Sequence, residues 1–346
     1  MKKSILFLAC ASLLAGSAAA QDAASLFAQG KAAIEKYDKM SADFQLQLVK
    51  DKNAEDVTAK ERAEIFMQGV DLLKQVLACD TIIEVDKKTG EPKIDKKTGK
   101  PKFKTKFSAE VVSILNGHVG DYGPIGDAYY KAQDFQKAFD AYDLYAKGLQ
   151  SDAFKDRVKS SDVGQVLFMQ AYMAFNLKQY ETAYDLSNKA EAMGFESTDI
   201  SVVRNNSVAL FVEQCVNEKA IDKANAFVDK CAAEKNTGFL QYLKGFIVEQ
   251  DKGFEAAESF YHKAIELDPS NAMAQLRCGD CLYKKAQKII DENLDASNKQ
   301  LAPKLIPLFE EAIPYFEKAK ELDDQCNAQA YLDDIQYKLE LLKSAK

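Results

Sequence analysis

Two cysteines separated by two residues, Cys278 and Cys281, form the pattern in this chain that most directly suggests chemistry. Such a pair can act as a redox couple or supply two ligands to a metal ion. A redox pair normally begins a helix, where the dipole stabilises the thiolate, whereas Gly279 is expected inside a helix. A metal would need further cysteine or histidine ligands, and the histidines are His118 and His262. We therefore expect packing or a structural disulfide, with thiol-redox chemistry as a remote alternative and no metal or cofactor.

Other catalytic machinery is not recognisable. Neither histidine has a serine or cysteine nucleophile at a motif spacing, and the sequence shows no phosphate-binding glycine loop or nucleophile elbow. His262 is expected on the solvent face of a helix, and His118 at the surface near a helix end. The net charge of −7 offers no basic face for nucleic acid. The sequence favours a protein that is not an enzyme and has no nucleic-acid partner.

The helices that hold these residues repeat at a fixed spacing. Gly279 lies 34 residues after Gly245, and Phe254 between them closes a turn. The ridge of the following helix consists of Ala257, Tyr261 and Ala264. Spacings of four and three place these side chains on one helix face, and the alanines let the first helix approach. The pattern predicts helix–turn–helix units with a small residue at each crossing.

Further copies of the unit precede Gly245. Their small crossing residues are Gly126 and Ala171, and their ridges are Ala138, Tyr142 and Tyr145 in one copy and Ala183, Ser187 and Ala190 in the other. Tyr145 departs from the pattern, which has a small residue there. The interval between Ala171 and Gly245 leaves room for a degenerate unit, with helices expected at about Asp199–Cys215 and Ala220–Ala233.

The unit that begins at Gly279 is interrupted by an insertion of 21 residues. The inserted segment, 285–304, is charged and helix-compatible, so we expect it to extend both helices of the unit. Pro303, Pro307 and Pro314 are expected to break or begin helical turns. A helix over 327–342 is expected to cap the array.

The first twenty residues predict a secretory signal peptide. Two lysines precede an apolar run over 5–16, and small residues at 18–20 offer a cleavage site. A lipoprotein signal ending at Cys10 is the less favoured alternative. No later run approaches the ~18 apolar residues of a membrane-spanning helix. Residues 21–346 are therefore expected to be exported to the periplasm, with association with the outer membrane left open.

The start of the exported chain predicts two helices and a basic loop. Helices are expected at Ala24–Tyr37 and Lys60–Cys79, the second with a capping box made by Thr58 and Glu61. Within residues 80–106 a nonapeptide, Val or Ile followed by Asp-Lys-Lys-Thr-Gly-x-Pro-Lys, occurs twice and contains turn-forming residues. This segment predicts a long exposed loop or small hairpin. It could contact an acidic partner or anionic lipid headgroups, or it could be a solvated linker.

Three segments together resemble the tetratricopeptide-repeat proteins that Bacteroidetes export. They are the 80–106 loop leading into Gly-Asp-Ala-Tyr-Tyr at 126–130, the inserted repeat with Ala-Ile-Pro-Tyr-Phe-Glu-Lys-Ala at 312–319, and the closing helix with Ala-Tyr-Leu at 330–332 and Tyr-Lys-Leu at 337–339. The resemblance implies an all-α, right-handed superhelical solenoid of about five to six repeat units. It implies little about function.

In such a fold the first helices of successive units line a concave groove. The side chains expected in this groove are Tyr130, Phe168, Tyr172, Phe175, Tyr242, Phe246, Leu276 and Tyr283. An aromatic groove suits an extended peptide or a partner helix. The alternative is that several of these side chains pack between repeats.

The groove predicts a protein interaction scaffold of the cell envelope with a protein or peptide partner. The carboxylate clamp of chaperone-binding relatives needs Lys, Arg and Asn where this chain has Phe168, Tyr172, Tyr242 and Phe246, so that activity is not expected. A glycan-binding accessory protein is the main alternative. The absence of Trp, a common platform for sugars, weakens it.

Overall fold

The computed structural model describes residues 23–80 and 82–344, so the predicted signal peptide lies outside the described residues. The described chain has the all-α fold of a tetratricopeptide-repeat solenoid. It forms two compact units, one up to Arg204 and one from Asn205 onward. The boundary lies within a helix, α8. No described helix is both long enough and apolar enough to cross a membrane.

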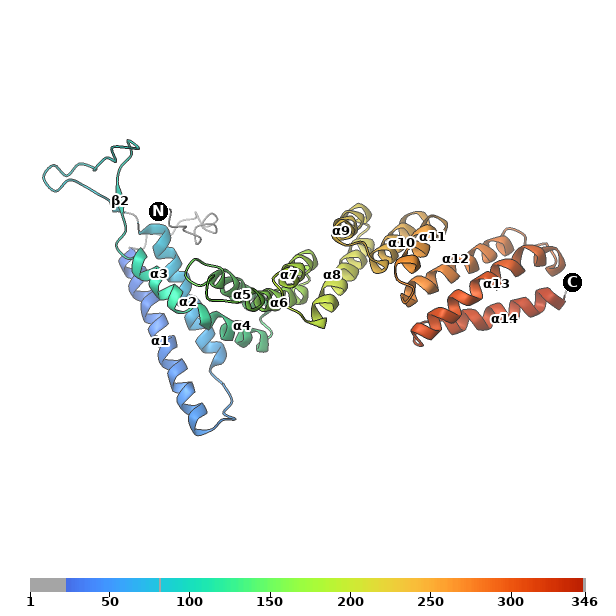
Figure 1. Ribbon diagram of the computed structural model, residues 1–346, viewed down its shortest axis with the longest axis horizontal. Helices are drawn as coiled ribbons and strands as arrows, with labels where there is room; N and C mark the ends of the chain where they lie inside the picture. The colour runs from blue at the N-terminus through green and yellow to red at the C-terminus, as the bar shows by residue number, and fades with distance from the viewer. Residues whose placement is uncertain (1–22, 81, 345–346) are drawn as a thin grey trace. The chain divides into compact units, whose positions relative to one another are not determined.

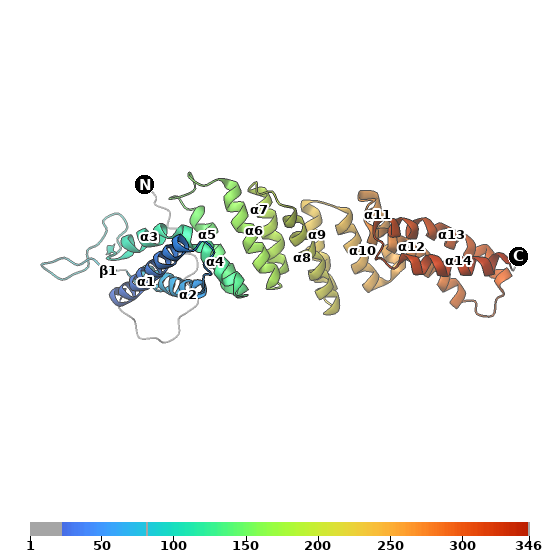
Figure 2. The ribbon, with the colours of Figure 1, turned by 90° about the horizontal axis from the view of Figure 1, so that it is seen from below.

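The first unit consists of helices that pack as antiparallel pairs, of which α1 with α2 and α6 with α7 are clear in Figures 1 and 2. Its elements are α1 (Ala23–Lys50), α2 (Ala59–Cys79), β1 (Ile82–Ile83), β2 (Phe103–Lys104), α3 (Ser108–Gly117), the 3-10 turn η1 (Val119–Asp121), α4 (Tyr122–Lys131), α5 (Phe135–Leu149), α6 (Ser160–Asn176), α7 (Tyr180–Ala192) and the start of α8 (Thr198–Asn217).

The second unit continues the pairing. Its elements are the remainder of α8, then α9 (Ile221–Glu234), α10 (Gly238–Lys252), α11 (Phe254–Leu267), α12 (Ala272–Asp291), α13 (Asn298–Leu322) and α14 (Ala328–Ser344). Helices α8 and α9 correspond to the degenerate unit. They pack through Phe211 and Phe227, whose ring centroids lie 4.5 Å apart. The inserted residues 285–304 form the end of α12, a connecting turn and the start of α13, so both helices are long.

The crossing glycines face aromatic rings of the second helix in the same pair. A Cβ added at Gly126 would lie 2.6 Å from Cε1 of Tyr142, and one at Gly245 would lie 2.5 Å from Cε1 of Tyr261. Both rings are buried. Because no real Cβ comes this close, each glycine is what allows the ring to lie between the two helices.

The departures from the pattern are compensated. Tyr145, which replaces a small residue, lies against Gly123, where a Cβ would be 2.9 Å from its Cε1. In the next unit the crossing residue is Ala171, and the ridge position that elsewhere holds the ring is Ser187. A larger residue on one helix is therefore matched by a smaller one on the other.

The prolines of α13 do not interrupt it. We expected Pro303, Pro307 and Pro314 to break or begin helical turns, but all three lie inside the helix. All three are exposed. Spacings of four and seven residues place them on one helix face, where the carbonyls that lose a backbone donor can be hydrated. Packing of the opposite face against α12 and α14 holds the helix together.

The start of the chain differs from expectation in two ways. Helix α1 continues beyond Tyr37 to Lys50, because it packs antiparallel along α2; for instance, the Arg62 guanidinium lies 5.0 Å from the Phe44 ring centroid. The capping box is also wrong. Thr58 makes no side-chain cap bond, and its hydroxyl instead donates to Oδ1 of Asp56 at 3.2 Å.

His118 is not the surface residue that the sequence suggested. Its side chain is 19% exposed, and its Nδ1 lies 2.8 Å from Oδ2 of Asp121 and 3.8 Å from Oδ1 of Asp38. Its ring packs edge-on against Phe66 at 5.7 Å. The hydrogen bond to Asp121 raises the pKa of His118 above its ordinary value, against the opposing effect of burial.

The glycine–tyrosine contact predicts a strong coupling between Gly245 and Tyr261. Gly245→Ala should lower the free energy of unfolding by about 1–2 kcal/mol, because overpacking outweighs the better helix propensity of alanine. In a Tyr261→Ser background the same change should be neutral or stabilising. Urea unfolding of the four chains measures the coupling. Equal effects in both backgrounds would contradict the contact.

The partly buried His118 predicts a pH-dependent stability. Because folding raises the pKa of His118, its contribution is fully present below the unfolded pKa of about 6.5 and is lost as pH rises through the folded pKa. His118→Gln should therefore cost about 1 kcal/mol more at pH 5.5 than at pH 8.5. Urea unfolding at the two pH values is the measurement, and an equal loss at both would refute this account.

Candidate functional site

The two cysteines of the Cys-x-x-Cys motif lie inside α12 and are each 1% exposed. Both are free thiols. Sγ of Cys278 lies 3.9 Å from Nδ1 of His262, and Sγ of Cys281 lies 3.7 Å from the carbonyl oxygen of Phe254. Burial raises the pKa of each thiol to about 12, which disfavours the thiolate. Within 23–80 and 82–344, no three His, Cys, Asp or Glu side chains are grouped to hold a metal. Both cysteine side chains pack in an apolar cluster with Ala257 and Tyr261.

The predicted groove residues of the first unit separate into two kinds. Tyr130 and Tyr172 join α4 to α6, with ring centroids 6.0 Å apart, and Tyr130 is 36% exposed. Phe168 instead packs against Phe195 at 5.7 Å, beyond the end of α7, and Phe175 packs against Tyr180 at 5.9 Å. The two tyrosines thus lie together at a partly exposed surface. The two phenylalanines instead pack against residues of their own repeat unit.

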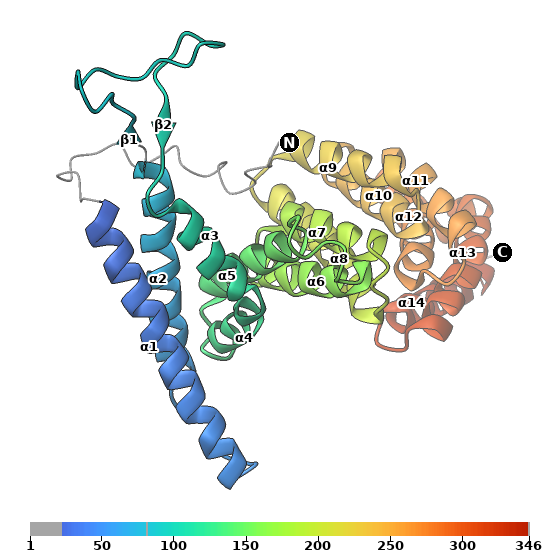
Figure 3. The same ribbon diagram turned by 60° about the vertical axis from the view of Figure 1, so that its left-hand side comes forward.

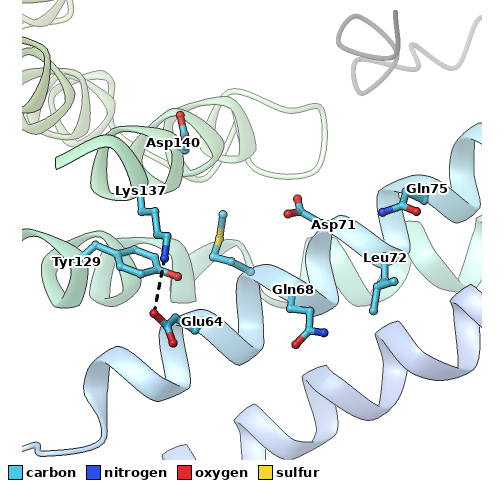
Figure 4. A pocket seen from close by; sticks show the side chains of 9 residues that line it. Glu64, Gln68, Asp71, Leu72, Gln75, Tyr129, Lys137 and Asp140 are labelled. Carbon is cyan, nitrogen blue, oxygen red and sulfur yellow. Dashed lines mark ion pairs between the residues drawn. The ribbon is translucent and has the colours of Figure 1, made fainter. Parts of the chain in front are cut away.

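A pocket of about 500 Å³ lies between α2, α4 and α5 in the first unit (Figure 4). It is lined by Glu64, Met67, Gln68, Asp71, Leu72, Gln75, Tyr129, Lys137 and Asp140. Lys137 lies 3.5 Å from Glu64 and 5.3 Å from the Tyr129 ring centroid. Burial raises the pKa of Asp140, and the charge of Asp143 adds to this. No spacing in the sequence indicates this acidic pocket, because its residues come from separate repeats.

The predicted groove residues of the second unit lie on α10 and α12. Tyr242 and Phe246 come from α10, and Leu276 and Tyr283 come from α12; all four are partly exposed. The Tyr242 ring lies 6.1 Å from that of Tyr261, and burial raises the pKa of Tyr242. These side chains are therefore neither fully buried in the core nor fully solvated.

Charged side chains outside the predicted groove residues link α10 to α12. Glu249 on α10 accepts a hydrogen bond from Lys284 on α12 at 2.6 Å and another from Tyr261 at 2.6 Å. Lys284 also lies 2.9 Å from Asp280. Burial would raise the pKa of Glu249, but these hydrogen bonds and the nearby Arg277 hold it below its ordinary value. A carboxylate that is only 9% exposed thus stays ionised.

Helix α14 joins the same arrangement. The Tyr331 hydroxyl donates to Asp280 at 3.1 Å, and the Tyr283 hydroxyl donates to Asp334 at 2.6 Å. Lys338 then donates to the hydroxyl of Tyr283 at 2.7 Å. We refer to Glu249, Arg277, Asp280, Tyr283, Lys284, Tyr331, Asp334 and Lys338 as the α10–α12–α14 network.

Arg277 is the least satisfied member of this network. Its Nη1 lies 3.4 Å from Asp280 and 3.8 Å from Glu249, both long for hydrogen bonds to charged groups. Its Nε is buried and has no hydrogen-bond partner. The side chain as a whole is 27% exposed, so a guanidinium with spare donors lies at the surface near Tyr242. A signal for this face was present in the sequence, since Arg277, Asp280 and Lys284 are spaced by three and four residues.

No protein-family description matches the sequence, and no curated protein matches it. Among solved structures, the chain is similar to a TPR-repeat protein of Bacteroides fragilis, with 16% identity and a TM-score of 0.38 over 64% of this chain and 98% of that one. It is similar to YrrB, described as a TPR protein with an unusual peptide-binding site, with 16% identity and a TM-score of 0.31 over 62% and 90%. It is also similar to the TPR2AB domain of yeast Sti1 in a pHSP90 complex, with 10% identity and a TM-score of 0.27 over 93% and 98%.

Proposed function

We propose that this protein is a non-catalytic scaffold that binds an extended segment of a partner protein along the α10–α12–α14 network. The observation that carries the proposal is Arg277, whose side chain is 27% exposed and whose Nη1 makes only long contacts with Asp280 and Glu249, at 3.4 and 3.8 Å. An arginine in this state can donate to a backbone carbonyl or carboxylate of a bound chain. Tyr242 and Phe246 would contact the apolar side chains of that partner.

The network suits binding because its side chains are already ordered. Glu249, Lys284 and Tyr261 hold one another in place, so little side-chain entropy remains to be lost on association. Its carboxylates, Glu249, Asp280 and Asp334, equal its cations in number. The site therefore favours a partner segment without a strong net charge, rather than a chain terminus held by several free cations.

The groove proposal is tested with Tyr242→Ala/Phe246→Ala and, separately, Arg277→Gln. A photo-crosslinking residue at Leu276 should capture a partner protein in envelope extract, and each variant should lower its capture at least tenfold, since central aromatic and arginine contacts dominate binding energy. Circular dichroism should show unchanged helicity. Tyr337→Ala/Leu294→Ala, which alters two side chains that are 62% and 81% exposed, is the matched control and should leave capture intact.

Two results would contradict this function. Capture that is equal in the variants and the parent would place the site elsewhere. A specific oligosaccharide found on a glycan array, without any crosslinked protein, would instead favour the glycan-binding alternative.

We propose further that the protein works in the periplasm and that its partner belongs to the cell envelope. Support comes from the two lysines, apolar run and small-residue cleavage site within residues 1–20. Expression of the whole sequence in a Gram-negative host should yield a periplasmic protein whose mass corresponds to a chain beginning at Gln21. An intact chain that stays in the cytoplasm would contradict export.

A further inference from the structure

The basic loop between α2 and α3 has an ordered backbone. Oδ1 of Asp86 accepts hydrogen bonds from the backbone N–H groups of Lys88 and Thr89, at 2.8 and 3.1 Å. Asp95 makes the same two bonds nine residues later, at 2.8 and 3.0 Å. Each copy of the nonapeptide therefore folds as its own tight turn.

Three segments of the loop meet in a closed ring of backbone hydrogen bonds. Lys93 donates to the carbonyl of Glu84 at 2.7 Å, Lys102 donates to that of Lys93 at 2.7 Å, and Glu84 donates to that of Lys102 at 2.8 Å. The short β1–β2 ladder continues from this ring. Figure 3 shows the loop standing away from the helices of the first unit beyond the β1–β2 ladder. The loop is thus a small structured element that projects into solvent.

Glu84, Lys93 and Lys102 form this ring of backbone hydrogen bonds, and each is followed in the sequence by an exposed apolar residue. These residues are Val85, Ile94 and Phe103, with exposed fractions of 48%, 51% and 55%. Because the three preceding residues are bonded to one another, Val85, Ile94 and Phe103 occupy equivalent positions around the ring of backbone hydrogen bonds, and we call them the apolar triad. Single exposed apolar side chains are common, but three at equivalent positions of one solvent-projecting element indicate a contact surface.

Lysines surround the triad. Residues 84–106 contain nine lysines and four acidic residues, in a chain whose net charge is −7. The lysines are Lys87, Lys88, Lys93, Lys96, Lys97, Lys100, Lys102, Lys104 and Lys106, and all are exposed. Asp86 and Asp95 use their carboxylates in the turns, where the backbone N–H groups keep the pKa of each low. Most of the positive charge is therefore not neutralised within the loop.

We propose that this loop binds the surface of an anionic lipid bilayer, with the apolar triad inserted among the headgroups and the lysines against their phosphates. Each lysine near such a surface raises partitioning about fivefold, and apolar side chains add to this by entering the headgroup boundary. An acidic protein fits less well, because lysine is depleted from protein interfaces and the triad is interspersed with lysines rather than joined into a dry core.

The test is co-sedimentation of the purified protein, obtained by expressing the whole sequence and with its N-terminus defined by mass spectrometry. Vesicles of 70% phosphatidylcholine and 30% phosphatidylglycerol are compared with vesicles of phosphatidylcholine alone. Binding to the anionic vesicles should be at least tenfold stronger and should weaken as salt is raised.

Two loop variants separate charge from insertion. Lys87→Gln/Lys88→Gln/Lys96→Gln/Lys97→Gln should weaken binding by roughly several hundredfold, at about fivefold for each lysine, and Val85→Ser/Ile94→Ser/Phe103→Ser should weaken it about tenfold. The lysine control is Lys50→Gln/Lys52→Gln/Lys299→Gln/Lys304→Gln, and the apolar control is Val49→Ser/Val57→Ser/Leu294→Ser, in which the replaced side chains are 81%, 84% and 81% exposed. Both controls should bind as the parent does, and all chains should keep their helicity.

Insertion is read directly from a fluorescent probe. The chain contains no Trp, so Phe103→Trp places a single indole in the triad. Its emission should shift to the blue on anionic vesicles and be quenched by brominated lipid, whereas Tyr337→Trp, at a 62% exposed position of the second unit, should do neither.

Three outcomes would overturn the proposal. The first is no preference for anionic vesicles, and the second is binding that both loop variants leave unchanged. The third is binding that depends on the lysines alone, without a blue shift at position 103. This last result would show a contact with charge only and would favour an acidic polymer or protein. None of these outcomes bears on the groove, because the variants of the two surfaces share no residue.

Discussion

The contact between a glycine on one helix and an aromatic ring on the next sets the geometry of the repeat pairs. At Gly126, Gly245 and Gly279 an added Cβ would come within 2.6, 2.5 and 2.9 Å of the facing ring. The ring fills the space that the missing side chain leaves, so the pair buries a large apolar surface at a close helix separation. Where Ala171 replaces the glycine, the facing residue on the second helix is Ser187 instead of an aromatic residue. The close crossing therefore limits the combined side-chain volume of the two facing residues.

The same contact fixes which side of α12 is left for binding. Gly279 must face Phe316 on α13, and successive residues of a helix are rotated by about 100°. Arg277 and Lys284 therefore point away from α13, toward Glu249 on α10. The glycine–aromatic contact sets the rotation of α12 about its axis, and this rotation also sets the direction of its charged side chains. A change in the core packing of α12 would therefore also move the α10–α12–α14 network. Cys278, rotated by about 100° from the glycine, lies on the side of α12 that packs against α11, which explains why its thiol is buried beside His262.

The sequence was sufficient for the repeat because the repeat depends on local spacing. Small and aromatic residues at fixed intervals predicted the helix pairs, including the degenerate one and the lengthened pair around the insertion. It failed where a partner from a distant segment decides the outcome. The prolines of α13 were tolerated because packing holds the opposite helix face, and His118 became half-buried against Phe66. The capping box failed for a local reason, because the Thr58 hydroxyl donates to Asp56, two residues before it. The eight aromatic and apolar groove residues could be proposed from periodicity. The hydrogen bond from Tyr283 to Asp334, 51 residues away, could not be predicted from local spacing.

The two surfaces proposed for binding differ in how their charges are balanced, and this gives them different physical properties. In the α10–α12–α14 network each cation lies against a carboxylate, so the field it projects is short-ranged and depends little on salt. In the loop the nine lysines outnumber the four carboxylates, two of which are held in turns, so the loop projects a positive field from an otherwise acidic chain. Ordered, neutral pairs favour selection of one partner by shape and hydrogen bonding, whereas exposed like charges favour attraction to an extended anionic surface. A chain that carries both can be concentrated at a surface by one element while the other selects a partner, without either contact altering the geometry that the glycine–aromatic pairs impose.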